Sequence, residues 1–243
     1  MGRGLVLKVS IILPTKNEED AIGKVLEEIK TAQLYLNSAI ILEPLVVDAS
    51  TDKTAEIAKS YGVKVIAQRS RGKGNAFKEA LQSLDGSQDM VIMADADYTY
   101  PFTYATYIAP VNNLQTIIYL LTVYGNDVVM GYRRWRDKGA MPQLNVLGNS
   151  LLSFLASVLY LYPVRDLCSG MWGFRKSALD RFKITSEGFT LEADLFTNAL
   201  KTGCKIAQFP IRYRARLGKS QAKFKPVVDW LKIVWFVIRR RFS

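Results

Sequence analysis

Histidine is absent from this chain of 243 residues, and cysteine occurs only twice. Without an imidazole, catalysis by a Ser-His-Asp or Cys-His arrangement is excluded, and so is a histidine metal site. Cys168 and Cys204 form no CxxC pair, so neither a disulfide framework nor a zinc site is indicated and both are expected to be buried thiols. Any metal would be held mainly by oxygen ligands, which favours Mg²⁺ or Mn²⁺.

Acidic residues are scarce at the C-terminal end. The last 32 residues hold ten basic residues against Asp229 alone, a net charge of +9, whereas the first 211 residues carry only +2 of the formal +11. Positive charge confined to one end indicates one localised anionic partner. Nucleic acid fits this pattern less well, because its binding proteins usually spread positive charge along a domain face.

The same end is rich in aromatic and aliphatic residues. Val227–Phe242 joins these to an arginine triplet at 239–241, which is typical of an amphipathic helix on an anionic membrane surface. This predicts a main domain at residues 1–225 and a membrane-interface helix at 226–243. The alternative is the stump of a longer chain with spanning segments beyond it. No signal peptide is expected, because Pro14 follows a short apolar stretch directly.

Two long stretches, Tyr98–Asn126 and Gly139–Val164, lack charged residues. Their length alone would suit a bilayer span. Both contain prolines and asparagines, however, so we expect amphipathic helices of a soluble domain, with one face against a core or a lipid surface.

Apolar runs alternate with helical periodicity through the first half of the chain. Strands are predicted at Leu5–Leu13, Ile40–Val47, Val63–Ala67, Met90–Ala94 and Asp127–Gly131. Helices are predicted at Glu18–Ala32, from Thr51 through Ser60, and at Ala76–Leu84. This alternation is typical of an α/β fold with a mostly parallel, doubly wound sheet flanked by helices.

Polar motifs follow the carboxyl ends of these strands, where open α/β sheets bind their ligands. Asp95 and Asp97 come directly after the apolar run Met90–Met93, and two such carboxylates can hold a hard divalent cation that bridges a diphosphate. Asp48 ends another strand, while Asp52 is better explained as an acid at a helix N-terminus. An acidic pair after a turn is also common for local hydrogen bonding alone.

Arg71-Gly72-Lys73-Gly74 resembles a phosphate-binding loop but lacks the G-x-x-x-x-G-K-[ST] pattern, so ATP hydrolysis is not supported. A basic turn before a helix explains the segment equally well.

Six motifs in order give the chain a family resemblance. They are IILPTKNEEDAIGKVLEEI, VVDASTDKTAEIA, RGKGNAFKEAL, MADADYTYP, DVVMGYR and VRDLCSGMWGFRKSAL. Together they resemble the family 2 inverting glycosyltransferases, and within them the dolichyl-phosphate mannose synthase group and its polyprenyl-phosphate relatives, over roughly residues 8 to 225. The resemblance implies a GT-A fold, a nucleoside-diphosphate sugar donor, and Mg²⁺ or Mn²⁺.

The resemblance also implies roles for individual residues. It assigns donor binding to Pro14, Thr15, Glu18, Asp48, Asp95, Ala96, Asp97, Arg133, Arg216 and Lys219. Within this set Asp48 would contact the base, Asp97 would bind the metal directly, and Asp95 would lie near metal and ribose. Arg216 and Lys219 would belong to a basic loop over the diphosphate. Thr99 stands where the mannose synthases often have a metal-assisting Gln, and Gln221 stands where the basic loop has Lys.

The acceptor side rests on Thr190-Leu191-Glu192-Ala193-Asp194, which resembles, with one inserted residue, a motif whose Asp is the base in cellulose-synthase-like members. Residues two apart on a helix point to different sides, so only one of Glu192 and Asp194 can reach an acceptor, and Asp194 is favoured. Both could instead be acids favoured by a helix dipole. Trp172, between two loop glycines, is the best candidate for a sugar platform, although aromatic residues are more often core.

The sequence therefore predicts a metal-dependent inverting hexosyltransferase at the cytoplasmic face of the cell membrane. Mannose from GDP-mannose is the favoured donor group, and a polyprenyl or dolichyl phosphate or a lipid-linked glycan the acceptor. Three alternatives stay open: a cellulose-synthase-like transferase using a UDP-sugar and a sugar hydroxyl, a sugar-nucleotide-forming nucleotidyltransferase, and a non-catalytic basic membrane-binding module. Pro14–Glu18 does not match the loop that the second needs, and intact Asp48, Asp95 and Asp97 disfavour the third.

Overall fold

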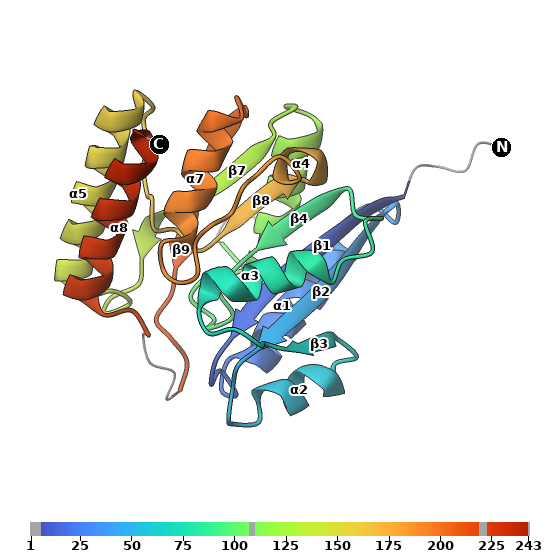
Figure 1. Cartoon of the computed structure of the whole chain (residues 1–243). Coiled ribbons are helices and arrows are strands. Elements are labelled where there is room, and N and C mark those ends of the chain that lie inside the picture. The colour runs from blue at the N-terminus through green and yellow to red at the C-terminus, as the bar shows by residue number, and fades with distance from the viewer. Residues whose placement is uncertain (1–5, 107–109, 219–222, 243) are drawn as a thin grey trace.

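The computed structural model describes residues 6–106, 110–218 and 223–242. Within this part of the chain, seven strands form one sheet in the order β3-β2-β1-β4-β8-β7-β9 (Figure 1). Their bounds are β1 Leu7–Thr15, β2 Ile40–Asp48, β3 Lys64–Ala67, β4 Met90–Met93, β7 Val128–Arg136, β8 Trp172–Arg175 and β9 Ile206–Tyr213. Neighbouring strands are parallel except at β8, which is antiparallel to β4 and β7. The short strands β5 (Thr103–Tyr104) and β6 (Val111–Asn112) form a separate antiparallel pair.

Helices cover both faces of this sheet (Figure 1). They are α1 Ile22–Leu34, α2 Thr54–Ser60, α3 Lys73–Gln82, α4 Asn113–Thr122, α5 Gln143–Tyr160, α6 Lys176–Leu179, α7 Leu191–Lys201 and α8 Pro226–Arg241. Successive side chains of a strand point to opposite faces. Ile11 accordingly packs in one core cluster with α1, α2 and α4, and Ile12 in a second with α3, α5, α6, α7 and α8. The core thus has two apolar layers, one on each face of the sheet.

All five predicted strands are present, with ends shifted by a few residues, and two further strands complete the sheet. β8 is only four residues long, and its antiparallel direction depends on partners far away in the chain. β9 contains Pro210, and a proline argues against a central strand because it has no backbone N–H to donate. The position of β9 at the end of the sheet explains why this proline is tolerated, because an edge strand leaves one row of backbone groups unpaired.

The two charge-free stretches contain α4 and α5, as expected for helices of a folded domain. α8 packs against α5 and α7, with Ile233 and Val237 buried in the second core cluster. α5 and α8 approach closely at Gly148, whose carbonyl oxygen accepts a hydrogen bond of 3.0 Å from the indole Nε1 of Trp230. Among the described residues no helix combines the length and apolar character needed to span a bilayer. The domain boundary expected at residue 225 stays a prediction.

Candidate active site

A cavity of about 830 Å³ opens beyond the carboxyl ends of β1 and β4. We call it the main cavity. Six segments of the chain contribute polar side chains to its wall. The polar side chains are those of Thr15, Glu18, Lys73, Asp95, Asp97, Arg133, Glu192, Arg216 and Lys223. The backbone and side chains of Pro14 and Ala96 complete this wall. Most residues assigned to donor binding from the sequence therefore lie around one cavity.

Asp97 is almost fully buried at the floor of the main cavity. Its Oδ1 accepts hydrogen bonds from the backbone nitrogen (3.1 Å) and hydroxyl (2.5 Å) of Thr99, and its Oδ2 forms an ion pair with the guanidinium of Arg216. Thr99 thus orients the carboxylate by hydrogen bonding, whereas a Gln there would reach further. The Oδ2 of Asp97 is therefore already paired with a cation of the chain, the guanidinium of Arg216.

Asp95 lies beside Asp97 and faces a different cation. Its Oδ1 is 2.5 Å from the ammonium nitrogen of Lys73. On the other side of the carboxylate stands Gly170, where an added Cβ would come within 2.2 Å of Asp95 Oδ2. Only glycine leaves room for this orientation of Asp95, so the loop before β8 helps to shape the acidic pair.

The acidic pair fits a hard divalent cation that arrives with a diphosphate. Within the described part of the chain, no group of three or more Asp, Glu, His or Cys side chains is arranged to enclose a metal ion. Mg²⁺ and Mn²⁺ bound with nucleotides commonly use one or two carboxylates and take their other ligands from phosphates and water. Asp95 and Asp97 supply such a pair of carboxylates. In this structure Lys73 and Arg216 pair with them, which is consistent with a site that favours positive charge.

The end of the cavity where a nucleoside is expected is built where β1 and β2 end in register, with Thr15 opposite Asp48. The Thr15 hydroxyl donates to Asp48 Oδ1 (2.7 Å), and the Ser50 hydroxyl donates to the same oxygen (2.6 Å). Asp48 itself does not line the main cavity, whereas its neighbours Thr15 and Ala49 do, so the expected contact of Asp48 with the base stays a prediction. Glu18 forms an ion pair with Lys223 from the segment after β9. Lys219 lies outside the described residues.

Arg133 is a buried cation with a fixed partner. Its Nε and Nη2 donate to the two oxygens of Asp166 at 2.7 and 2.6 Å, and Asn149 donates to Asp166 Oδ1 at 2.9 Å. Burial by itself would raise the pKa of Asp166, but the charge and hydrogen bonds of Arg133 outweigh it and lower that pKa. Asp166 was assigned no role from the sequence, although it lies in the motif VRDLCSGMWGFRKSAL, and Asn149 was missed because α5 has no recognisable motif.

The structure corrects the preference for Asp194 as the acceptor-side residue. Asp194 has no exposed surface, and its oxygens accept from the backbone nitrogens of Thr185 (2.6 Å) and Ser186 (2.7 Å), from Asn198, and from Arg240 of α8 (2.8 Å). It faces away from the main cavity because it lies two residues after Glu192 on α7. Glu192 is the member of the pair that lines the cavity.

Glu192 is itself paired. Its Oε1 is 2.5 Å from the Lys73 nitrogen, which also contacts Asp95. Burial raises the pKa of Glu192, and the charge of Lys73 offsets only part of that effect. Lys73 was not assigned a role from the sequence, although the two glycines that flank it were a usable signal.

Trp172 is not a sugar platform. It is the first residue of β8, has no exposed surface, stacks on Phe174 and donates its indole N–H to the Ser169 carbonyl oxygen (2.7 Å). A strand directed into the second core cluster leaves no face of this ring for a ligand. Cys168 does line the main cavity, but burial raises its pKa to about 12, so it is no thiolate nucleophile at neutral pH.

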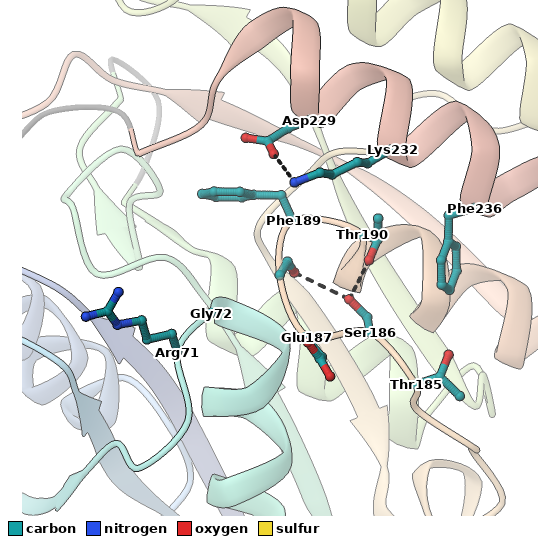
Figure 2. Close-up of a pocket in the computed structure, with 11 residues that line it drawn as sticks. Arg71, Gly72, Thr185, Ser186, Glu187, Phe189, Thr190, Asp229, Lys232 and Phe236 are labelled. Carbon is teal, nitrogen blue, oxygen red and sulfur yellow. Dashed lines mark hydrogen bonds and ion pairs between the residues drawn. The ribbon is translucent and has the colours of Figure 1, made fainter.

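The other half of the main cavity is apolar. It runs between α5 and α8, and its lining includes Leu144, Leu147, Leu151, Leu152, Phe224, Val227, Trp230 and Ile233. Beside it is a second pocket of about 480 Å³, shown in Figure 2, which shares Arg71, Gly72, Gly188 and Phe189 with the main cavity. The loop at 185–190 lies between the second pocket and the main cavity, and its residues Gly188 and Phe189 line both. The main cavity itself thus combines a charged floor with an apolar channel.

Comparison with known proteins agrees with this architecture. Residues 10–182 match the model of glycosyl transferase family 2. The chain is 35% identical over 213 residues to a dolichyl-phosphate hexose transferase of Haloferax volcanii, covering 88% of this chain and 86% of that protein. It is 25% identical over 247 residues to a dolichol-phosphate mannosyltransferase of Pyrococcus furiosus, covering 96% of this chain but 64% of that longer protein.

Solved structures agree on the fold. Glucosyl-3-phosphoglycerate synthase from Mycobacterium tuberculosis, in complex with Mn²⁺, UDP-glucose and phosphoglyceric acid, matches with a TM-score of 0.70 at 22% identity, over 97% of this chain and 80% of that one. Mannosyl-3-phosphoglycerate synthase from Rubrobacter xylanophilus matches with a TM-score of 0.68 at 23% identity, over 97% and 73%. The expected GT-A fold is confirmed, and the chain belongs to glycosyl transferase family 2 and is a glycosyltransferase.

Proposed function

We propose that this enzyme transfers a hexose, with inversion, from a nucleoside-diphosphate sugar to the phosphate of a polyprenyl lipid at the cytoplasmic face of the cell membrane. The observation that carries the proposal is the two-part main cavity. A charged floor with Asp95, Asp97 and Arg216 suits a diphosphate, and the apolar channel between α5 and α8 suits an acyl or isoprenoid chain. An acceptor whose phosphate meets the donor at the floor while its hydrocarbon chain lies in the channel is an amphiphile with an anionic head.

The state of the acidic residues favours a phosphate over a hydroxyl as the nucleophile. A hydroxyl needs a general base, which must lie within hydrogen-bond reach and be free to take a proton. Glu192 is paired with Lys73, and Asp194 is paired with Arg240 outside the cavity. A phosphate is ionised already at neutral pH and needs no such base. The cellulose-synthase-like alternative, which needs such a base, is therefore the less favoured of the two.

In the proposed reaction a phosphate oxygen of the lipid attacks the anomeric carbon, and the bond from that carbon to the nucleoside diphosphate breaks with its electron pair on the leaving group. A divalent cation held by Asp95 and Asp97 would neutralise the departing diphosphate. Arg216 and Lys223 lie on the same side of the cavity and add donors to the leaving group once it occupies the floor.

Mannose from GDP-mannose is the donor we favour, because the relative from Pyrococcus furiosus is named a dolichol-phosphate mannosyltransferase. The relative from Haloferax volcanii is named for hexose transfer to dolichyl phosphate, which fits the same acceptor class.

The surface beside the channel supports the proposed membrane location. On α5, Leu144, Leu147, Leu151, Phe154 and Val158 are exposed at helical spacing, and on α8 Val227, Val228, Leu231 and Trp235 are exposed next to an arginine triplet. Apolar residues flanked by cations are the signature of a helix in the interface of an anionic bilayer. The proposed acceptor could then enter the channel without leaving the membrane.

The test is transfer from radiolabelled GDP-mannose, UDP-glucose and UDP-N-acetylglucosamine to polyprenyl phosphate in anionic vesicles, with Mn²⁺ present. We expect labelled lipid phosphate from one donor, and its loss on chelation of the metal. Label appearing only on a sugar hydroxyl, or on no acceptor with any donor, would contradict the proposal.

Asp97→Asn is the matching variant, because it keeps the shape of the side chain and removes the charge that the metal needs. We expect transfer to fall by about a hundredfold or more, with the thermal unfolding midpoint within a few degrees of wild type. Asp180→Asn, at an exposed i,i+4 ion pair with Lys176, is the control and should keep full activity.

A further inference from the structure

Lys73 is a buried cation that joins the two ends of the main cavity. It is the first residue of α3, and its ammonium nitrogen is 2.5 Å from Asp95 Oδ1 and 2.5 Å from Glu192 Oε1. Asp95 follows β4 at the donor floor, whereas Glu192 is in the first turn of α7 next to the apolar channel. One side chain therefore connects three elements that are distant in the sequence.

The local sequence brings Lys73 to this point through its two neighbouring glycines. An added Cβ at Gly72 would lie 2.2 Å from the carbonyl oxygen of Glu187, and one at Gly74 would lie 2.5 Å from that of Ser186. Gly72 also has a φ of +106°, which L side chains rarely adopt. Figure 2 shows Gly72 at the start of α3 facing the loop that carries Ser186 and Glu187. Any side chain at either glycine would push α3 away from the loop at 186–188, which precedes α7.

Without this ammonium group, the arrangement of the two carboxylates would be unfavourable. Their nearest oxygens are each 2.5 Å from the same nitrogen, so they are no more than about 5 Å apart. Two carboxylates at that separation repel each other, and the side chain of Glu192 is only 9% exposed, so water screens its charge poorly. Asp95 has little freedom to turn aside, because Gly170 closes its other face.

Lys73 differs in this respect from the other cations of the floor. Arg216 and Lys223 belong to the segment between β9 and α8, whereas Lys73 is fixed on a helix and is only 13% exposed. Lys73 also contacts two carboxylates, whereas Arg216 forms an ion pair with Asp97 and Lys223 forms one with Glu18. Its geometry suits a permanent part of the site.

We propose that Lys73 is a positioning residue for glycosyl transfer, which holds Asp95 toward the metal and diphosphate while neutralising Glu192 beside the acceptor channel. This rests on the proposed function, since it assigns Asp95 to the metal–diphosphate complex. Its consequence is that the damage from losing Lys73 comes largely from the uncompensated charge of Glu192, and removing that charge restores the site.

A double-mutant cycle with the full chain tests this consequence. The variants are Lys73→Met, Glu192→Gln and their combination, with Lys78→Met on the same helix but outside the cavity lining as the control. The readout is the dissociation constant of GDP and of UDP in the presence of Mn²⁺, measured by calorimetry. We expect Lys73→Met to weaken binding by about tenfold to a hundredfold, and Glu192→Gln and Lys78→Met each by less than about threefold.

The combined variant decides the matter. We expect it to recover most of the lost affinity, because no unpaired carboxylate then faces Asp95. A combined variant as weak as Lys73→Met, or unchanged binding in Lys73→Met, would overturn the proposal. Lys73→Arg keeps the charge and should bind better than Lys73→Met.

Thermal unfolding without ligand separates this proposal from the proposed function. The unfolding midpoint should fall in Lys73→Met and rise again when Glu192→Gln is added, whether or not a nucleotide binds. Absence of Mn²⁺-nucleotide binding by the wild-type chain would contradict the proposed function, while absence of recovery in the unfolding midpoint would contradict the pairing of Lys73 with Glu192.

Discussion

Three acidic side chains of the main cavity are paired with cations from the chain itself. Lys73 pairs with Asp95, Arg216 with Asp97, and Lys223 with Glu18. In each case the ion pair forms where the proposed donor would bring its own charges, a divalent cation near the aspartates and a diphosphate near the basic residues. Binding of the donor would exchange the Arg216–Asp97 and Lys223–Glu18 ion pairs for contacts with the donor, while Lys73 keeps Asp95 in place. The affinity for the donor is therefore a difference between two sets of electrostatic interactions.

Arg216→Gln tests that exchange at one residue. The guanidinium competes with a metal for Asp97, so its removal should tighten Mn²⁺ binding to the nucleotide-free chain by about tenfold, a coupling of about 1.4 kcal/mol. Electron paramagnetic resonance of free Mn²⁺ measures this directly. Lys223→Gln removes a charge from the same segment but not from Asp97 and is the control. If Mn²⁺ binding tightened equally in both variants, the cause would be the loss of one positive charge in general and not competition between Arg216 and the metal for Asp97.

Asp194→Asn separates a structural role from a catalytic one. Asp194 is fully buried and paired with Arg240, and removal of one partner of a buried ion pair costs on the order of 3 kcal/mol. We expect urea denaturation to show a loss of this size in the free energy of unfolding, with transfer by the folded fraction largely retained. A variant of wild-type stability that had lost transfer would instead restore Asp194 as a base.

At the scale of elements, α5 and α8 form one surface. Each helix buries one side against the second core cluster and exposes apolar residues on the other, and the contact between Trp230 and Gly148 holds them together. Helices that expose a continuous apolar side are unusual in a monomer in water, since large apolar patches generally mark an interaction site. The channel of the main cavity runs between the same two helices.

Phe154→Ser tests this surface without touching the cavity lining. Phe154 is 69% exposed on α5, and its insertion into a bilayer would contribute about 1.5–3 kcal/mol, so its loss should weaken partitioning into polyprenyl-phosphate vesicles by about tenfold or more. Vesicle sedimentation measures the effect. Val123→Ser, at the end of α4 on the opposite face of the sheet, should leave partitioning unchanged. A similar loss in both variants would point to a general solubility effect.

At the scale of the whole molecule, charge and apolar surface coincide. α8 carries Lys232 and the arginine triplet 239–241 against Asp229 alone, and Figure 1 shows α8 lying alongside α5 at one side of the domain. The other described basic residues of the last 32 include four that pair with carboxylates elsewhere in the domain, and these are Arg212, Arg214, Arg216 and Lys223. Such an asymmetric molecule is oriented by an anionic bilayer before any specific contact forms. In the proposed location, the apolar channel between α5 and α8 would then face the lipid.

Arg239→Gln with Arg241→Gln tests the electrostatic part, and Arg240 is left in place because it pairs with Asp194. Each arginine near an anionic surface contributes about 1 kcal/mol, so binding to anionic vesicles should weaken by about tenfold to thirtyfold, and the difference should vanish in high salt. Binding to neutral vesicles should be unaffected. An equal loss on neutral vesicles would show that the substitutions act on packing.

Local pattern determined much of this protein. The strands β1, β2 and β4 and the helix α1 follow from apolar runs and periodicity among residues close in the sequence, so they were predictable together with a mostly parallel α/β sheet. The GT-A architecture was implied by the family resemblance. The family motifs determined which residues gather at the strand ends, since parallel strands bring their carboxyl ends to one edge.

Only the tertiary structure decided which side chains face the cavity. Helical periodicity separates Glu192 from Asp194 but does not say which of them meets Lys73, a partner 119 residues away in the chain. The burial of Trp172, the antiparallel direction of β8 and the pairing of α5 with α8 likewise depend on contacts between distant segments. Such contacts depend on close backbone approach and complementary charge in three dimensions. A small rotation of a helix about its axis changes which of its side chains faces the cavity.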